Sequence, residues 1–207
     1  MGDPVRLTGG DGRRAYGTIA ILDKRRLEID CDLASLDLVP APPHVSIWAP
    51  IGDRDRMLTL AEKSVELAGS AWRSVAYRRS RSVTPRGEGT AFQEKLRLRM
   101  IAALEQCGGA WLPGIEPEAD AMDVIPTVPT GRGILLDASG APFADALAAT
   151  HPPVVIALGP EGGLDPAERT AFAGAGWRTA SLGANVLRFE TAGIAGLALS
   201  RALLRST

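Results

Sequence analysis

Two glycine-containing segments near the carboxyl end have residue types and spacing that could bind a ligand together. The first is VVIALGPEGGLDPAE at 154–168, and the second is SLGANVLRFETA at 181–192. In each, a short apolar or β-branched run leads to a glycine-containing turn and then to a helical pattern, so two loops at neighbouring strand ends could face one small ligand. Main-chain atoms would supply most of the contacts. This arrangement is typical of a cofactor site.

The residues of the first loop set its shape and its charge. The glycines of LGPEGG, residues 158–163, remove side chains where the backbone must approach a ligand, and Pro160 stiffens the bend. The loop lacks the Lys-Ser/Thr pair of a phosphate-binding P-loop and the G-x-G-x-x-G pattern of dinucleotide sites. Glu161 and Asp165 would repel a pyrophosphate, but they suit a positively charged ligand such as the sulfonium of S-adenosylmethionine.

These two segments resemble the C-terminal signature of the SPOUT, or α/β-knot, methyltransferases. They are most similar to the RsmE family, which methylates uridine N3 in 16S ribosomal RNA. Three upstream segments resemble the same family in the same order: DRMLTLAEKSVELAG at 55–69, RSRSV at 79–83 and LEQCGGAWLP at 104–113. The resemblance implies a homodimeric enzyme that uses S-adenosylmethionine and needs no metal.

The resemblance also assigns the cofactor pocket to the two loops. Their backbone atoms would hold adenine and ribose, whereas a pair of plain tight turns is the alternative interpretation. The implied cofactor-binding residues are Leu158, Gly159, Pro160, Glu161, Gly162, Gly163, Ser181, Leu182, Gly183, Val186, Leu187 and Arg188.

Arg188 and Glu190 are the candidate catalytic residues. N3 of uracil is normally protonated at neutral pH, so its methylation needs a group that accepts this proton or stabilises its loss. Arg188 could bind a uracil oxygen or a phosphate, and Glu190 could accept the N3 proton or orient Arg188. The two could equally form a structural ion pair at the start of the last helix.

Candidate substrate contacts lie upstream of the two loops. Basic residues outnumber acidic ones between 73 and 99, which favours phosphate contact, although a solvated surface is the alternative. The implied substrate contacts are Glu62, Lys63, Glu66, Arg79, Arg81 and Gln106. The first three share one turn of a helix, which could instead be an interface or a solvated face. Gly109 stands where the family has an arginine, so one expected cationic contact is missing.

The elements that must position these residues alternate between strand and helix. Strand-like runs such as HVSIWAP at 44–50 precede the helical patterns, which lie near 54–68, 91–106, 142–149, 166–174 and 189–204. Asp165, Pro166 and Glu168 have the spacing of an N-cap, a first helical residue and a capping-box partner. We expect a loop with one helical turn between Gly114 and Gly133. The alternation predicts a parallel α/β sheet, and the resemblance adds a deep C-terminal trefoil knot.

Residues 1–44 are predicted to form a small antiparallel β domain, with strands at 5–8, 15–22 and 25–31. The proline-rich PAPP at 40–43 indicates a linker, so the methyltransferase domain is expected at 45–207. GDPVRLTGGDGRRAYGTI, residues 2–19, resembles the middle of the family's RNA-binding PUA-like β-barrel. The family's first strands have no counterpart, so we expect a truncated barrel whose RNA docking is weakened or shared with another subunit.

Composition fits one catalytic domain with a small extension, since the chain has 207 residues, 45% of them hydrophobic, and a net charge of −1. No apolar run approaches the roughly eighteen residues of a membrane span, and no secretory leader is apparent, so we expect a cytoplasmic protein. Cys31 and Cys107 have no metal-site spacing to each other or to a histidine. We therefore expect two small core residues, with neither a metal site nor a disulfide.

The leading hypothesis is a methyltransferase that uses S-adenosylmethionine and acts on uridine N3 of 16S ribosomal RNA. Two alternatives stay open. The chain could be a weak or inactive SPOUT-fold protein that binds RNA or assists ribosome assembly, given the short N-terminal part and Gly109. It could also be a SPOUT methyltransferase that acts on transfer RNA.

Overall fold

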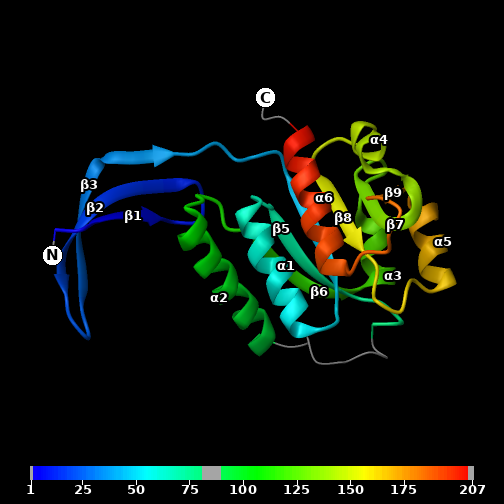
Figure 1. The fold of residues 1–207 in the computed structure, drawn as a ribbon, viewed down its shortest axis with the longest axis horizontal. Coiled ribbons are helices and arrows are strands. Elements are labelled where there is room, and N and C mark those ends of the chain that lie inside the picture. The colour runs from blue at the N-terminus through cyan, green and yellow to red at the C-terminus, as the bar shows by residue number, and fades with distance from the viewer. Residues whose placement is uncertain (1, 81–89, 205–207) are drawn as a thin grey trace.

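The computed structural model describes residues 2–80 and 90–204 and contains two sheets (Figure 1). The smaller sheet is antiparallel, with the order β1-β2-β3. Its strands are β1 (Pro4–Thr8), β2 (Arg13–Leu22) and β3 (Leu27–Leu38). The larger sheet has the order β6-β5-β4-β8-β7-β9, and every neighbouring pair is parallel. The predicted parallel α/β sheet is therefore confirmed.

The strands of the larger sheet are β4 (Val45–Pro50), β5 (Ala71–Ala76), β6 (Gly114–Asp120), β7 (Gly133–Pro142), β8 (Val154–Leu158) and β9 (Arg178–Ser181). The helices are α1 (Arg54–Glu66), α2 (Thr90–Cys107), α3 (Ala121–Val124), α4 (Phe143–Ala148), α5 (Pro166–Gly174) and α6 (Phe189–Leu203), with a 3₁₀ turn η1 (Ile125–Thr127). The five expected helices are all present. Parallel neighbours need a crossover between them, and the helices provide it.

Two hydrophobic cores cover opposite faces of the larger sheet. Ile47 of β4 packs into a core shared with α1, α2, α4 and α6, whereas its neighbour Trp48 packs into a core shared with α3, η1 and α5. Successive strand residues point to opposite faces, so one strand supplies both cores. All six residues of β4 are buried, as expected for a central strand between two helical layers.

The smaller sheet projects from the α2 side of the body (Figure 1) and is joined there by a short contact. Gly12 N–H donates to the Ala110 carbonyl at 2.9 Å, and Leu112 N–H donates to the Gly10 carbonyl at 2.8 Å. The Trp111 indole N–H donates to the Val39 carbonyl at 3.0 Å. The turn between β1 and β2 is thereby tied to the chain that follows α2.

Two local expectations were wrong. The segment from Gly114 begins with strand β6 rather than a loop. Pro117 is tolerated there because β6 is an edge strand and its pairing with β5 is irregular at that point. Cys31 and Cys107 are exposed, not core residues, since no layer covers β3 at Cys31 and Cys107 ends α2. Within the described ranges, no helix is long and apolar enough to cross a membrane.

The contact between the β1–β2 turn and Trp111, which forms the joint between the two sheets, can be tested by mutation. Gly12 has φ +93°, and a Cβ there would lie 2.5 Å from the Trp111 ring. We expect Gly12→Ala to lower the free energy of unfolding by about 1–2 kcal/mol through backbone strain, and to displace the indole from Val39. Urea unfolding and limited proteolysis of the 39–44 linker measure these two effects.

Gly131→Ala is the matched control, because Gly131 has φ +81° and no atom within 4 Å of the added Cβ. It carries the backbone strain without the clash. If the linker is cleaved equally faster in Gly12→Ala and in Gly131→Ala, Trp111 does not hold the two sheets together.

Candidate functional site

A cavity of about 280 Å³ lies at the carboxyl ends of β8 and β9, beside the middle of β7, where its pairing with β8 ends. Ligands of open α/β sheets bind at this edge, because the loops that leave parallel strands converge there. Residues of the loop that follows β8, of the loop that follows β9 and of the middle of β7 line this cavity. The two glycine-containing segments singled out in the sequence thus face one space.

Eleven of the twelve predicted cofactor-binding residues line this cavity. They are Leu158, Gly159, Pro160, Glu161, Gly163, Ser181, Leu182, Gly183, Val186, Leu187 and Arg188. The exception is Gly162, which turns toward Arg79: a Cβ at Gly162 would lie 3.0 Å from the Arg79 Cβ. Gly162 therefore permits close packing behind the loop and does not belong to the cavity wall.

Glu168 holds the first loop from beneath. Its buried carboxylate accepts the Asp165 N–H at 2.8 Å and the Arg78 N–H at 2.7 Å. The Asp165 side chain in turn accepts the Ala167 N–H at 2.9 Å, which completes the predicted capping box. These bonds fix the end of the loop to the start of α5 and to the chain after β5.

Arg79 supports the same loop from its outer side. Its guanidinium donates to the Gly162 carbonyl at 2.9 Å. This predicted substrate residue thus contacts the cofactor loop and does not line the cavity. The other predicted arginine of this segment, Arg81, lies outside the described residues.

Sequence reasoning missed an ion pair in the cavity wall. Asp137, in the middle of β7 just after its pairing with β8 ends, accepts a hydrogen bond from the Arg169 guanidinium at 2.8 Å, and both residues line the cavity. Ser139 donates its N–H and its hydroxyl to the same carboxylate. These Ser139 hydrogen bonds are the main reason that the pKa of Asp137 lies below its ordinary value, and Arg169 lowers it further. No local sequence motif predicts this pair, because the two residues are distant in the sequence and meet only in the folded chain.

Arg188 is an exposed residue on the cavity rim. It is the N-cap residue of α6 and forms no ion pair with any described residue. Glu190, the second residue of α6, does not line the cavity, and its carboxylate lies 4.0 Å from Arg56 Nε. The alternative in which Arg188 and Glu190 pair with each other is therefore wrong. Arg56 also contacts Glu161, and nothing in the sequence pattern had singled it out.

The structure does not bring the remaining predicted substrate residues to the cavity. Lys63 bridges Glu62 at 2.9 Å and Glu66 at 2.8 Å along α1, and Arg99 of α2 adds a contact to Glu62 at 3.2 Å. The Lys63 hydrogen bond lowers the pKa of Glu62. Gln106 is exposed near the end of α2. In residues 2–80 and 90–204, no group of three or more His, Cys, Asp or Glu side chains is placed to hold a metal ion.

Comparison with known proteins places this geometry in a family context. The model of a family described as an RNA methyltransferase domain matches residues 40–201. A curated relative, Ribosomal RNA small subunit methyltransferase E from Treponema pallidum (strain Nichols), is 31% identical over 189 residues. The alignment covers 87% of this chain and 66% of the relative, so the chain spans just under two thirds of that protein's length.

Solved structures are similar over almost the whole of this chain. A Ribosomal RNA small subunit methyltransferase E from Neisseria gonorrhoeae, bound to S-adenosyl methionine, is similar with a TM-score of 0.85 and 25% identity, over 98% of this chain and 84% of that one. A probable rRNA-methyltransferase from Porphyromonas gingivalis is similar with a TM-score of 0.81 and 25% identity, over 98% of this chain and 85% of that one.

The buried carboxylate beneath the loop is open to a direct test. Glu168→Gln keeps the shape of the side chain but removes the charge and replaces one acceptor oxygen with a donor. We expect the free energy of unfolding to fall by about 1–3 kcal/mol, because a buried N–H loses its acceptor. Urea unfolding measures the change.

Glu105→Gln is the control, since Glu105 is an exposed residue of α2. If the two variants lose equal stability, Glu168 does not anchor the loop.

Proposed function

Because this chain belongs to the RNA methyltransferase domain family, we propose that it is an enzyme that methylates uridine N3 in 16S ribosomal RNA with S-adenosyl-L-methionine. The observation that carries the proposal is the convergence of both glycine-containing loops on one cavity at the carboxyl edge of the sheet. Similarity to a small-subunit methyltransferase E solved with S-adenosyl methionine supports the choice of cofactor and substrate.

The residues that line the cavity fit this cofactor. Gly163 and Gly183 have φ +72° and +143°, so each bends its loop without placing a side chain against the ligand. Glu161 and Asp137 supply negative charge for a cationic ligand. When bound, S-adenosylmethionine supplies an electrophilic methyl group on a sulfonium, and the electron pair of the broken S–C bond stays on sulfur. The chain's own contribution is to hold and orient this group and to exclude water.

Arg188 is the proposed catalytic residue that meets the substrate. The uracil N3 lone pair forms the new N–C bond, and the N3 proton leaves to a base or to water. Arg188 lies on the cavity rim, and its guanidinium forms no ion pair with the residues that the structure describes. It would bind a uracil oxygen and so stabilise negative charge as the proton departs. Glu190 lies outside the cavity lining and beside Arg56, which favours a supporting role for it over acceptance of the N3 proton.

Two architectural proposals accompany the enzyme assignment. The first is a deep trefoil knot in a SPOUT domain of residues 45–207: β9 is an edge strand, yet α6 returns to pack on β4 and β8. The second is a homodimer, supported by the exposed apolar side chains of Leu199 and Leu203 on α6 and of Val186 beside the cavity.

The remaining proposals concern RNA and cellular location. Residues 1–44 would act as a partial PUA-like domain that contacts RNA, supported by the antiparallel sheet and by the exposed basic turn 24–26. Glu62, Lys63, Glu66, Arg79, Arg81 and Gln106 stay proposed substrate or interface contacts. Work on ribosomal RNA would place the enzyme in the cytoplasm.

Two measurements test the proposed function. Calorimetry should detect binding of S-adenosylmethionine, and mass spectrometry of RNA from a deletion strain should show loss of one N3-methyluridine from 16S ribosomal RNA. Binding with unchanged methylation would favour the inactive RNA-binding alternative. A lost transfer RNA modification with intact ribosomal RNA would favour the other alternative.

Replacing Arg188 should separate catalysis from cofactor binding. We expect Arg188→Met to slow methyl transfer about 100-fold, the typical loss for one group that stabilises developing negative charge. The Kd for S-adenosylmethionine should change by less than about threefold, since main-chain atoms dominate that contact. Transfer of a labelled methyl group and calorimetry provide the two readouts.

Arg178→Met is the control. Arg178 is an exposed arginine at the start of β9, at the opposite end of the strand from the cavity. Equal slowing in both variants would contradict a role for Arg188 in the reaction.

A further inference from the structure

Arg56 joins two acidic residues that come from different segments around the cavity. Its guanidinium contacts the Glu161 carboxylate, and its Nε lies 4.0 Å from Glu190 Oε1. Glu161 belongs to the loop after β8 and lines the cavity, whereas Glu190 belongs to the first turn of α6. One side chain of α1 therefore spans the loop and the helix between which the cavity lies.

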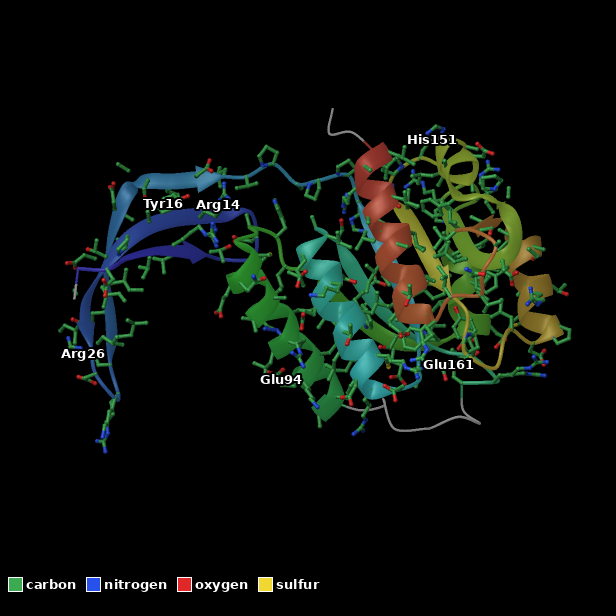
Figure 2. The ribbon with its side chains drawn as sticks, in the orientation of Figure 1. Arg14, Tyr16, Arg26, Glu94, His151 and Glu161 are labelled. Atoms are coloured by element: carbon green, nitrogen blue, oxygen red, sulfur yellow. The ribbon has the colours of Figure 1, made fainter. Side chains whose placement is uncertain are left out.

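The start of α1 gives Arg56 a fixed base. Asp53 is the N-cap residue, and its carboxylate accepts the Arg56 N–H at 3.0 Å. The helix packs along α6, and both begin at the same end of the molecule, beside the labelled Glu161 (Figure 2). Because Arg56 leaves the first turn of a capped helix, its side chain starts from a defined position.

The surroundings of the two carboxylates differ. The Glu190 side chain is 14% exposed, and its Oε2 atom is buried with no hydrogen-bond partner in the described part of the chain. The Glu161 side chain is 38% exposed, so solvent screens it in part. Arg56 is the cation in contact with both, which leaves this group with one net negative charge. Removing the cation would leave a partly buried carboxylate and a cavity-lining carboxylate without compensation.

We propose that Arg56 is a positioning residue for methyl transfer, which holds Glu161 and Glu190 in place and sets the negative charge that the cavity presents to its cofactor. The proposal rests on the proposed function. It has a second consequence at the rim. Arg188 lies two residues before Glu190 and lines the same cavity as Glu161. With both carboxylates engaged by Arg56, the Arg188 guanidinium stays available for RNA.

The cofactor and its product report this charge directly. S-adenosylmethionine carries a sulfonium cation, and S-adenosylhomocysteine has the same adenosine and amino-acid parts without that charge. An uncompensated carboxylate in the cavity favours the cation over the neutral sulfide by Coulomb attraction. The ratio of the two dissociation constants therefore measures the cavity charge. A loss of packing alone weakens the binding of both ligands by the same factor and leaves the ratio of their dissociation constants unchanged.

Calorimetry with both ligands on the full chain tests the proposal. For Arg56→Met we expect the Kd for S-adenosylhomocysteine divided by the Kd for S-adenosylmethionine to rise about tenfold. Arg56→Lys keeps the charge and should stay within about threefold of the wild-type ratio. Adding Glu161→Gln to Arg56→Met should return the ratio toward the wild-type value, because it removes the uncompensated charge.

Arg54→Met is the matched control. Arg54 occupies the same helical turn, but its guanidinium lies over the Phe92 ring, 5.6 Å from the centroid. We expect no change in the ratio. Should Arg56→Met fail to fold, the single variant Glu161→Gln still tests the idea. It leaves Arg56 with less negative charge to offset, so the ratio should fall below the wild-type value.

The outcomes separate the inference from the function on which it rests. If the wild-type protein binds neither ligand, the proposed function and the inference fall together. If it binds both, but the ratio is unchanged in Arg56→Met and in Glu161→Gln, the proposed function stands and the role of Arg56 is overturned.

Discussion

The buried carboxylate of Glu168 is the anchor on which the geometry of the site depends. A pocket walled by main-chain atoms needs loops that keep their shape although they place few side chains inside. Glu168 meets this need because its two oxygens accept N–H groups from Asp165 and from Arg78, which are far apart in the sequence. Arg79, the next residue, then reaches the Gly162 carbonyl. The loop is thus held at its base and along its outer side, and its inner side stays open to the cavity.

Acidic side chains around this loop each contact an arginine. Asp137 is offset by Arg169 in the cavity wall, and Glu161 by Arg56 at the start of α1. Each cation comes from a helix that packs against the sheet, so the packing of the helices sets the electrostatic potential inside the cavity. Arg188 differs from these cations because no described carboxylate pairs with it. Its position at the rim leaves one cation facing outward, where a polyanionic substrate approaches.

The sequence was sufficient for the parallel sheet, the five helices and the two loops, because periodicity, capping residues and glycine patterns are local signals. The Asp165–Glu168 capping box was readable for the same reason. The Asp137–Arg169 pair and the role of Arg56 were not, since their partners meet only after the strands are ordered. Strand β6 was hidden by Pro117, whose missing N–H matters little at an irregular edge.

At the N-terminal joint, the fold brings an arginine of the smaller sheet to the turn where the sequence departs from the family pattern. Gly109 lacks the arginine that the resemblance led us to expect, but the turn at Gly108 and Gly109 is not without a cation. The guanidinium of Arg6, from β1, lies directly against Gly108, which has φ +72° and no side chain to block the approach. A side chain at Gly108 would displace this guanidinium. Gly109 thus replaces one arginine of the family pattern, and Gly108 leaves room for Arg6 from the smaller sheet. The position of Arg6 against this turn therefore depends on the docking of β1, which Trp111 and the hydrogen bonds of Gly10 and Gly12 maintain.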